Sequence, residues 1–416
     1  MRVLLIGSGG REHALARALA ADEAVEMLFA APGNPGIAAV AELREIDPLQ
    51  PSAVAALAVE THADLVVVGP EAPLVAGVAD AVRAKGIACF GPSAAAARLE
   101  GSKAFAKEIM AAADVPTARA HVCTTAHEAA EALDDFGPPY VVKNDGLAAG
   151  KGVVVTDDRA AALAHAEDCG RVIIEEYLDG PEVSLFVVTD GEAALPLLAA
   201  QDFKRVGDGD TGPNTGGMGA YVPLPWAPDG LTDTVMSTVV LPTLREMAGR
   251  GTPFSGLLYV GLALTHEGPR VIEFNARFGD PETQAVLELL ESPLAGLLNA
   301  AAAGLLAEHP PLRWRAGAAV VVVVASAGYP GAPRTGDVIT GADAAGVTHA
   351  GTARRAADGA LLSAGGRVLG CTGTGPDLAS ARTRAYQLVD EISLDGAVFR
   401  RDIALAAVEG RVRLPG

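Results

Sequence analysis

Short apolar runs alternate with longer amphipathic stretches over residues 1–100 of the chain. Four of these runs have the length and β-branched content of buried strands: Val3–Ile6, Met27–Ala30, Leu65–Val68 and Ile87–Phe90. Three stretches between them have the length of helices: Arg11–Ala20, Pro51–Glu60 and Val75–Lys85. This alternation predicts an open parallel sheet with crossover helices, and ligands bind such sheets beyond the carboxyl ends of the strands.

Three glycine-containing loops follow these strands and should share one edge of the sheet: 7–12, 32–36 and 69–74. The first reads GSGGRE, so Glu12 stands where a dinucleotide-binding G-x-G-x-x-G motif needs glycine. Backbone N–H groups at a helix N-terminus can still hold a phosphate, and Arg11 adds positive charge. We expect a small phosphorylated molecule at this edge; a plain tight turn is the alternative.

The next stretch combines an alanine-rich helix with short strands. The helix is predicted over Ser93–Ala113 and carries Lys103 and Lys107. Three strands follow it: Tyr140–Lys143, Val153–Thr156 and Val172–Glu175. Residues 145–152, DGLAAGKG, do not form a P-loop, because only three residues separate the two glycines and another glycine follows the lysine. A glycine-rich hairpin of this kind can fold over phosphates, and we expect it to be a lid that a bound phosphate chain orders.

The stretch VIEFNARFGDPE at 271–282 carries a row of three polar side chains. Its first four residues predict a strand, and Glu273, Asn275 and Arg277 then share one face at steps of about 7 Å. Carboxylate and carboxamide oxygens suit Mg²⁺, and a guanidinium suits a phosphate or carboxylate. A half-exposed strand with a surface salt bridge is the alternative. The neighbours on the other face are predicted to enter the core: Ile272, Phe274 and Ala276.

The second half of the chain contains one long polar connection and one boundary. Residues 201–219, QDFKRVGDGDTGPNTGGMG, are too rich in functional side chains for an ordinary loop, so we expect them to bind substrate. A helix is predicted over Glu282–Leu290, and HPP at 309–311 interrupts an alanine-rich helix, which indicates a domain boundary. Beyond it the chain is rich in glycine and β-type segments. Its most apolar run, 317–327, is too short to span a bilayer and predicts a buried strand.

Composition excludes several classes of protein. The 416 residues include 51 acids against 32 bases, so the net charge of −19 argues against nucleic acid or an anionic membrane as partner. The four cysteines form no C-x-x-C pair, which argues against a zinc site or a disulfide framework. The N-terminus enters an apolar strand without a cleavage-type motif. We expect a soluble cytoplasmic protein of three or four domains.

Together these stretches resemble the ATP-grasp ligases, and within them the glycinamide ribonucleotide synthetase (phosphoribosylamine–glycine ligase) family. The resemblance runs along the whole chain and rests on eight segments: GSGGREHALA (7–16), GPEAPLVAGV (69–78), GPSAAAARLEGSKAF (91–105), KNDGLAAGKGVVV (143–155), EEYLDGPEVS (175–184), QDFKRVGDGDTGPNTGGMGAY (201–221), VIEFNARFGDPETQ (271–284) and GYPGAPRTGDVI (328–339). The ATP-binding segments are shared widely among such ligases, whereas GPEAPL and DTGPNTGGMGAY are more specific to this family.

The resemblance implies a multidomain α/β and α+β protein. An open parallel α/β domain (1–102) would precede an ATP-grasp fold (103–310, with a lid subdomain at about 115–190), and a small β-rich domain (311–416) would follow. It implies that ATP phosphorylates glycine and that 5-phosphoribosylamine attacks the glycyl phosphate, giving glycinamide ribonucleotide, ADP and phosphate in de novo purine biosynthesis. ATP and Mg²⁺, for which Mn²⁺ can substitute, would be the cofactors of a monomer or weak homodimer.

The resemblance also assigns roles to individual residues. The catalytic residues would be Arg277, Lys143 and Asp280. ATP would be bound by Lys103, Lys143, Gly146, Lys151, Glu175, Tyr177, Leu178 and Glu182. The other substrates would be bound by Gly10, Arg11, Asn34, Glu71, Asp202, Asn214, Gly216 and Arg277. The metal ligands would be Glu273 and Asn275.

The sequence departs from the family pattern in places. Phe203 stands where a histidine is common and Asn144 where an alanine is, and residues 256–265 contain none of the acids that many ATP-grasp enzymes place on the preceding strand. Two alternatives remain: another ATP-grasp ligase of the purine pathway, or a non-catalytic nucleotide sensor. The GPEAPL and DTGPNTGGMG segments count against the first. The intact Glu273, Asn275, Arg277 and Lys143 count against the second.

Overall fold

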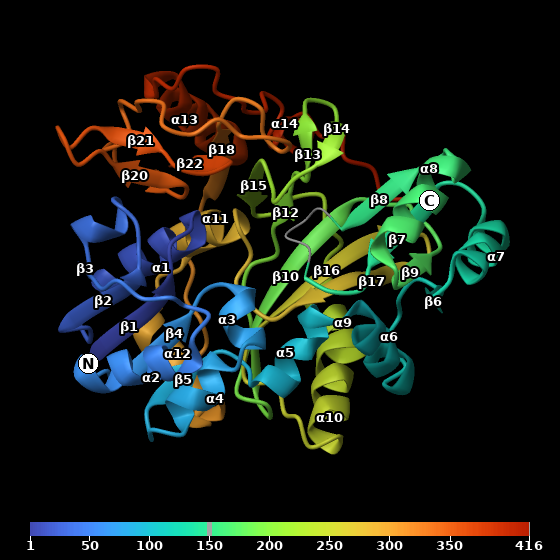
Figure 1. The fold of residues 1–416 in the computed structure, drawn as a ribbon, viewed down its shortest axis with the longest axis horizontal. Helices are drawn as coiled ribbons and strands as arrows, with labels where there is room; N and C mark the ends of the chain where they lie inside the picture. Colours follow the sequence, from blue (N-terminus) through green and yellow to red (C-terminus); the bar gives the residue numbers. More distant parts are fainter. Residues whose placement is uncertain (148–151, 416) are drawn as a thin grey trace.

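A computed structural model describes residues 1–147 and 152–415 of the chain. Figure 1 shows an N-terminal α/β domain in blue, a lid subdomain in teal and green, a central sheet in green and yellow, and a C-terminal domain in orange and red. Residues 148–151 of the predicted lid hairpin lie outside the described residues, and with them the assignment of Lys151.

The N-terminal domain is the open parallel sheet that the alternating pattern predicts. Its strands pair in parallel in the order β3-β2-β1-β4-β5. They are β1 (Arg2–Gly7), β2 (Met27–Pro32), β3 (Glu42–Leu43), β4 (Leu65–Val68) and β5 (Ala88–Phe90). The helices are α1 (Gly10–Ala20), α2 (Pro51–Glu60), α3 (Glu71–Val75) and α4 (Val78–Arg83). A later helix, α12 (Leu294–Ala303), joins the core on one face of this sheet through Leu294, Leu297 and Leu298.

Two predicted helices differ from the structure in their extent. The helix predicted over Val75–Lys85 corresponds to α4 and begins only at Val78, because Gly77 before it has a left-handed φ of 91°, which favours glycine, and Val75 ends the preceding helix α3. The helix predicted over Ser93–Ala113 is divided at Ser102 into α5 (Ala94–Gly101) and α6 (Lys103–Ala112). Ser102 is extended there and its hydroxyl accepts the Phe105 N–H. Lys103 consequently stands at the first position of a helix instead of in its middle.

The lid subdomain has a small core of its own. Its antiparallel sheet has the order β6-β9-β7-β8. The strands are β6 (Ala120–Cys123), β7 (Tyr140–Asn144), β8 (Val153–Thr156) and β9 (Val172–Glu175), and the helices are α7 (Ala126–Phe136) and α8 (Arg159–Cys169). Residues such as Leu133, Val142 and Ile174 form a hydrophobic cluster separate from the rest of the molecule.

The central sheet has the order β11-β10-β16-β17 and carries the polar row at 273–277. Its strands are β10 (Glu182–Thr189), β11 (Ala194–Pro196), β16 (Gly256–Thr265) and β17 (Gly268–Asn275). The helices after β15 and β17 are α9 (Leu231–Val235), the π-helix η2 (Met236–Val240), α10 (Leu241–Gly249) and α11 (Glu282–Leu289). Because β10 pairs with β16, the second half of the range predicted for the lid belongs partly to this sheet.

The C-terminal sheet includes strands from the middle of the chain. Its order is β12-β15-β18-β22-β19. The strands are β12 (Gln201–Asp202), β15 (Gly219–Val222), β18 (Ala318–Ala325), β19 (Val347–His349) and β22 (Arg367–Gly375). Two small hairpins, β13 (Arg205–Gly207) with β14 (Thr211–Asn214) and β20 (Thr352–Arg354) with β21 (Leu361–Ser363), and the helices α13 (Leu378–Glu391) and α14 (Leu405–Val408) complete this part. The sheet thus crosses the division predicted at residue 310, and β18 is fully buried as expected.

In the described part of the chain, every helix is too short or too polar to cross a lipid bilayer.

Candidate active site

The predicted polar row lies on β17 and just beyond its end. Phe274 and Ala276 face the core and are 3% and 2% exposed, as alternation predicts. Ile272 is only half-buried, so its predicted core position was wrong. The reason is a bulge beside the Gly261–Glu273 pair, which breaks the two-residue alternation one position before Glu273.

Glu273 is held as a carboxylate by surrounding lysines. Burial on its own raises the pKa of Glu273, but Lys204, Lys143 and Lys103 together hold it below its usual value. The Lys204 Nζ lies 3.9 Å from the Glu273 Oε1. Asn275 adds a carboxamide oxygen two residues further along β17. An ionised carboxylate beside a carboxamide fits Mg²⁺, which takes few protein ligands and completes its shell with water and substrate phosphates.

No cluster of three His, Cys, Asp or Glu side chains that could hold a metal occurs within residues 1–147 and 152–415. A site built from Glu273 and Asn275 therefore depends on the phosphates of a bound nucleotide for further ligands.

A buried carboxylate orders the lysines expected at the nucleotide phosphates. The Glu175 carboxylate lies between two ammonium groups, 2.7 Å from the Lys143 Nζ and 2.9 Å from the Lys107 Nζ. Lys143 also donates to the Ile272 carbonyl at 2.9 Å. Lys103 donates to the Gly146 carbonyl at 3.0 Å. Of the residues assigned to ATP, Lys103 thus contacts Gly146 and Lys143 contacts Glu175, and Lys107 is a further partner of Glu175.

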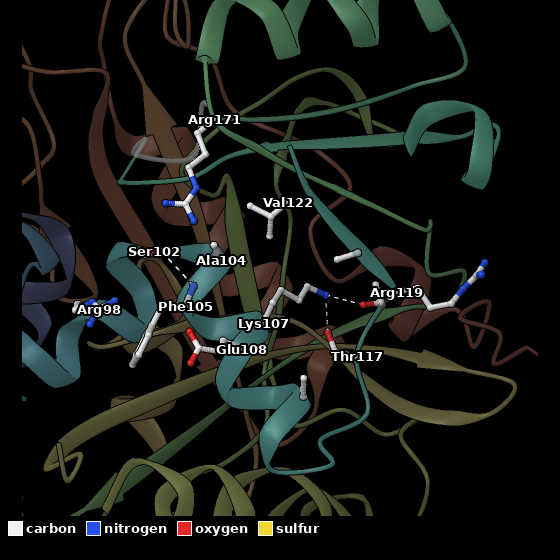
Figure 2. A pocket seen from close by; sticks show the side chains of 13 residues that line it. Arg98, Ser102, Ala104, Phe105, Lys107, Glu108, Thr117, Arg119, Val122 and Arg171 are labelled. Atoms are coloured by element: carbon white, nitrogen blue, oxygen red, sulfur yellow. Dashed lines mark hydrogen bonds between the residues drawn. The ribbon is translucent and has the colours of Figure 1, made fainter. Parts of the chain in front are cut away.

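A groove of about 710 Å³ lies between α6 and β6, and Lys107 is one of the residues that line it (Figure 2). Figure 2 shows the Lys107 ammonium turned toward Thr117, to which it donates at 2.9 Å. Two other cations of the groove are matched by carboxylates: Arg119 by Glu176 at 2.9 Å and Arg171 by Asp145 at 3.2 Å. Three of the four cations that line the groove, Lys107 among them, thus have carboxylate partners. The fourth, Arg98, lies over the Phe105 ring at 4.2 Å.

The segment after β9 contains the residues expected beside the adenine and ribose. Tyr177 is 48% exposed and Leu178 is half-buried. Glu182 begins β10, and its carboxylate Oε2 lies 2.5 Å from the Lys204 Nζ. Glu182 and Glu273 therefore share Lys204 as a cationic neighbour. Burial lowers the pKa of Lys204, but the carboxylates of Glu182, Asp202 and Glu273 outweigh burial and raise that pKa well above its usual value.

Arg277 joins the polar row to the N-terminal domain. Its guanidinium contacts Glu71 at 3.2 Å and Glu100 at 3.1 Å. The buried Glu100 also accepts the Ala276 N–H at 2.7 Å, which fixes the backbone beside Arg277. Glu71 and Arg277, which the resemblance assigns separately to substrate binding, are thus in direct contact, and Glu100 is a neighbour that the sequence does not reveal.

The glycine-rich loop before α1 is occupied by a carboxylate of the chain itself. Glu12 accepts the Gly9 N–H at 2.7 Å and lies 2.5 Å from the Arg11 Nε. Arg11 also donates to the Phe278 carbonyl at 3.0 Å. A Cβ on Gly9 would come within 2.7 Å of Glu12, and one on Gly10 within 2.8 Å of Gln284. Glycine at these two positions therefore leaves room for the side chains of Glu12 and Gln284 to pack against the backbone, which a tight turn alone would not require.

Asn34 and Asp280 tie the domains together. Asn34 donates to the carbonyls of Ser8 and His349, and its Oδ1 accepts two N–H groups, so its carboxamide is fully used within the protein. Asp280 lies 3.4 Å from Arg367 and accepts from the Arg11 N–H at 3.4 Å. Burial raises the pKa of Asp280, but Arg367 and Arg11 hold it below its usual value.

The long polar connection reaches the site through β12 and the β13–β14 hairpin. Burial raises the pKa of Asp202 to about 8; Lys204 opposes this shift, and the neighbouring Glu282, Glu182 and Glu273 add to it. Asn214 donates to the Val153 carbonyl of the lid at 3.4 Å. Gly216 is held by Tyr329 at 3.0 Å and by Arg367 at 2.5 Å.

Comparison with known proteins identifies the family. Family models for the N, ATP-grasp (A) and C domains of phosphoribosylglycinamide synthetase match residues 1–100, 101–283 and 319–406. The phosphoribosylamine–glycine ligase of Streptomyces coelicolor is 65% identical over 415 residues, covering 98% of this chain and 99% of that protein. The chain belongs to the phosphoribosylglycinamide synthetase family. Its relative in Mycobacterium tuberculosis (strain H37Rv) is 59% identical over 99% of this chain and 100% of that protein.

Solved structures support the same fold for this synthetase. The phosphoribosylamine–glycine ligase of Thermotoga maritima matches with a TM-score of 0.85 and 34% identity, covering 97% of this chain and 100% of that one. The biotin carboxylase domain of the Hydrogenobacter thermophilus 2-oxoglutarate carboxylase, solved with MgADP, has a TM-score of 0.71 at 17% identity over 96% of this chain and 91% of that one. The synthetase is thus an ATP-dependent ligase of purine biosynthesis with an ATP-grasp fold, as the sequence predicts.

Replacing Asp202 by asparagine should stabilise the synthetase increasingly as pH rises. Between its ordinary pKa of about 3.9 and its value of about 8 in the fold, Asp202 binds more protons folded than unfolded, so its contribution to stability falls across that window. Asp202→Asn removes this cost, and its melting temperature should exceed that of the parent by roughly 2–4 °C more at pH 8 than at pH 5. Scanning calorimetry in EDTA, with the exposed Asp229→Asn as control, tests this; a pH-independent difference contradicts it.

Proposed function

We propose that this chain ligates glycine to 5-phosphoribosylamine at the site where β17 meets the N-terminal domain. The observation that carries the proposal is the contact of Arg277 with Glu71. It joins the lysine- and carboxylate-lined nucleotide site of the ATP-grasp fold to the strand-end loops of the parallel sheet, where ligands bind in such domains. The carboxylate of glycine and the amine of the ribosylamine would meet at this junction.

Residues of the chain have distinct proposed roles in the reaction. Glu273 and Asn275 would hold Mg²⁺ or Mn²⁺, which lowers the repulsion between the anionic reactants when it is bound. Lys103 and Lys143 would neutralise the nucleotide phosphates, and Glu175 would orient the Lys143 ammonium, from which it lies 2.7 Å away.

The remaining chemistry is proposed for Arg277 and the loops around it. The Arg277 guanidinium would bind the acyl phosphate of glycine while the amine of phosphoribosylamine attacks its carbonyl carbon and phosphate leaves. Gly10, Arg11 and Glu71 would receive the ribosylamine, and Asp202, Asn214 and Gly216 the small substrates. Asn34 and Asp280 would act by holding these loops in place, because their polar atoms are used within the protein.

An assay of ADP release tests the proposed reaction. Phosphoribosylamine is unstable, so it would be generated in place, and ADP would be measured with glycine present and with glycine withheld. ADP release that needs both glycine and the amine supports the proposal. Release that is independent of glycine, or absent with both, contradicts it. Sedimentation velocity of the same sample would test the proposed monomer or weak homodimer.

Glu71→Gln should weaken use of phosphoribosylamine far more than use of ATP. Glu71 lies on α3 of the N-terminal domain and loses its charged contact with Arg277, whereas the lysines at the nucleotide site keep their partners. We expect the KM for phosphoribosylamine to rise about tenfold or more while the KM for ATP changes less than about twofold. Steady-state kinetics with the exposed Glu60→Gln as control would measure both. Equal rises in the two constants would argue that the first domain is not the amine site.

A further inference from the structure

Arg400 is a fully buried cation far from the polar row in sequence. It lies between α13 and α14, and its side chain is 1% exposed. Its guanidinium donates twice to the Asp402 carboxylate at 2.7 and 2.6 Å, and also to Asp210 at 2.6 Å and to the Arg205 carbonyl at 3.2 Å. Four hydrogen bonds from one planar fork fix the relative placement of the groups that accept them.

These bonds attach the β13–β14 hairpin to the C-terminal domain. Two further bonds accompany them: Gly209 donates to Asp402 at 2.8 Å, and the Arg401 N–H donates to Asp208 at 2.7 Å. The tip of the hairpin, residues 208–210, is therefore clamped by the segment 400–402.

Arg400 also supports the base of the hairpin through Phe203. The guanidinium carbon lies 4.7 Å from the centre of the Phe203 ring, whose other neighbour is the Tyr221 ring at 6.1 Å. Phe203 continues the pairing of β12 with β15, because its N–H donates to the Gly219 carbonyl at 3.0 Å. The side chains of Asp202 and Lys204, on either side of Phe203, therefore point to the face opposite Phe203. On that face both lie near the carboxylates of Glu182 and Glu273.

We infer that Arg400 is a positioning residue for the ligation reaction, which sets Asp202 and Lys204 against the nucleotide site by fixing Phe203 and the hairpin tip. The inference rests on the proposed placement of Asp202 at the small-substrate site. It gives a buried arginine of the C-terminal domain a part in the reaction although its own hydrogen bonds go to Asp402, Asp210 and Arg205. Lysine cannot replace Arg400, because an ammonium lacks the planar fork that serves both carboxylates and stacks on the ring.

The test compares Arg400→Lys and Arg400→Met with a matched control, Arg355→Met. Arg355 also lies in the C-terminal domain and donates twice to one carboxylate, that of Asp358 at 2.9 and 2.7 Å, but these two residues lie on the β20–β21 hairpin and not in the 400–402 segment. For both Arg400 variants we expect the KM for glycine to rise about tenfold and kcat to fall, with the KM for ATP within about twofold of the parent. Arg355→Met should leave all three nearly unchanged. Loss of ATP and glycine use in equal measure would overturn the inference.

A milder variant covers the case in which the Arg400 variants do not fold. Asp210→Asn keeps an acceptor oxygen but removes the negative charge that pairs with Arg400 at the exposed tip of the hairpin, and it should raise the KM for glycine by a smaller factor. In the double variant Asp202→Asn/Asp210→Asn, the KM for glycine should rise by less than the product of the rises in the two single variants, because both residues act on one unit. A rise equal to that product would overturn the inference. If Asp202→Asn alone leaves glycine use unchanged, the proposed substrate site fails instead.

Discussion

Replacing Glu273 by glutamine is expected to abolish most of the turnover while leaving the fold intact. Glu273 keeps its charge because three lysines surround it, and it is the only carboxylate of the polar row on β17. Glutamine keeps the shape but removes the negative charge that a divalent cation needs. A lost metal ligand removes several kcal/mol of transition-state stabilisation, so kcat should fall roughly a hundredfold or more.

The measurement is the rate of ADP release over a range of Mg²⁺ concentrations. Glu267→Gln is the matched control, since Glu267 lies in the turn between β16 and β17 and pairs only with the surface residue Arg270 among the described residues. The control should retain full activity. If Glu273→Gln regained near-normal turnover at saturating Mg²⁺, the assignment of Glu273 to the metal would be wrong.

Replacing Arg277 by lysine should have an effect of similar size on kcat. Arg277 contacts two carboxylates from two parts of the chain, Glu71 and the buried Glu100. The compact ammonium of lysine lacks the planar fork that spans both carboxylates and a substrate oxygen. Breaking this arrangement also leaves Glu100 buried with a weakened partner. A lost donor at developing negative charge costs about a hundredfold in kcat, and we expect a loss of that order.

The affinity for ATP separates this effect from general damage to the site. Binding of a non-hydrolysable ATP analogue should change little in Arg277→Lys, because the phosphate lysines and Glu175 are untouched. Arg270→Lys is the control, since Arg270 lies on β17 and pairs with Glu176 and Glu267. A loss of analogue affinity as large as the loss of turnover would place Arg277 at the nucleotide instead.

The parts of the structure that follow from local pattern were predictable from the sequence. Four of the five strands of the N-terminal sheet were located because each is a short apolar run between loops, and most of the face of β17 because side chains alternate along a strand. The fifth, β3, has only two residues and no such run, and it was missed. The same rules failed where local pattern was ambiguous. The break that places Lys103 at a helix start was missed because alanine-rich sequence continues on both sides of it, although Gly101 and Ser102 are a helix-ending glycine and an N-cap serine. The bulge at Glu273 depends on the partner strand.

Pairings between distant segments were not predictable from local pattern. Glu100 meets Arg277, and Lys107 meets Glu175, only because α5 and α6 pack beside the central sheet and the lid. A lone acid or lysine on a predicted helix carries no signal of such a partner. Asn34 shows the converse, since a polar residue in a strand-end loop suggested ligand binding, while the structure uses its carboxamide to join the first domain to His349.

The sheet that crosses the predicted domain boundary has a consequence for the synthesis of the chain on the ribosome. One edge of β15 pairs with β18, which emerges only after residues 223–317 have been made. At 5–20 residues per second the ribosome needs roughly 5–20 s to make this stretch, and until then the edge of β15 has no partner from β18. An unpaired strand edge is a template for aggregation. A nascent chain that stalls within this stretch therefore exposes an aggregation-prone strand edge, and truncating the protein near residue 310 would leave that edge unpaired permanently.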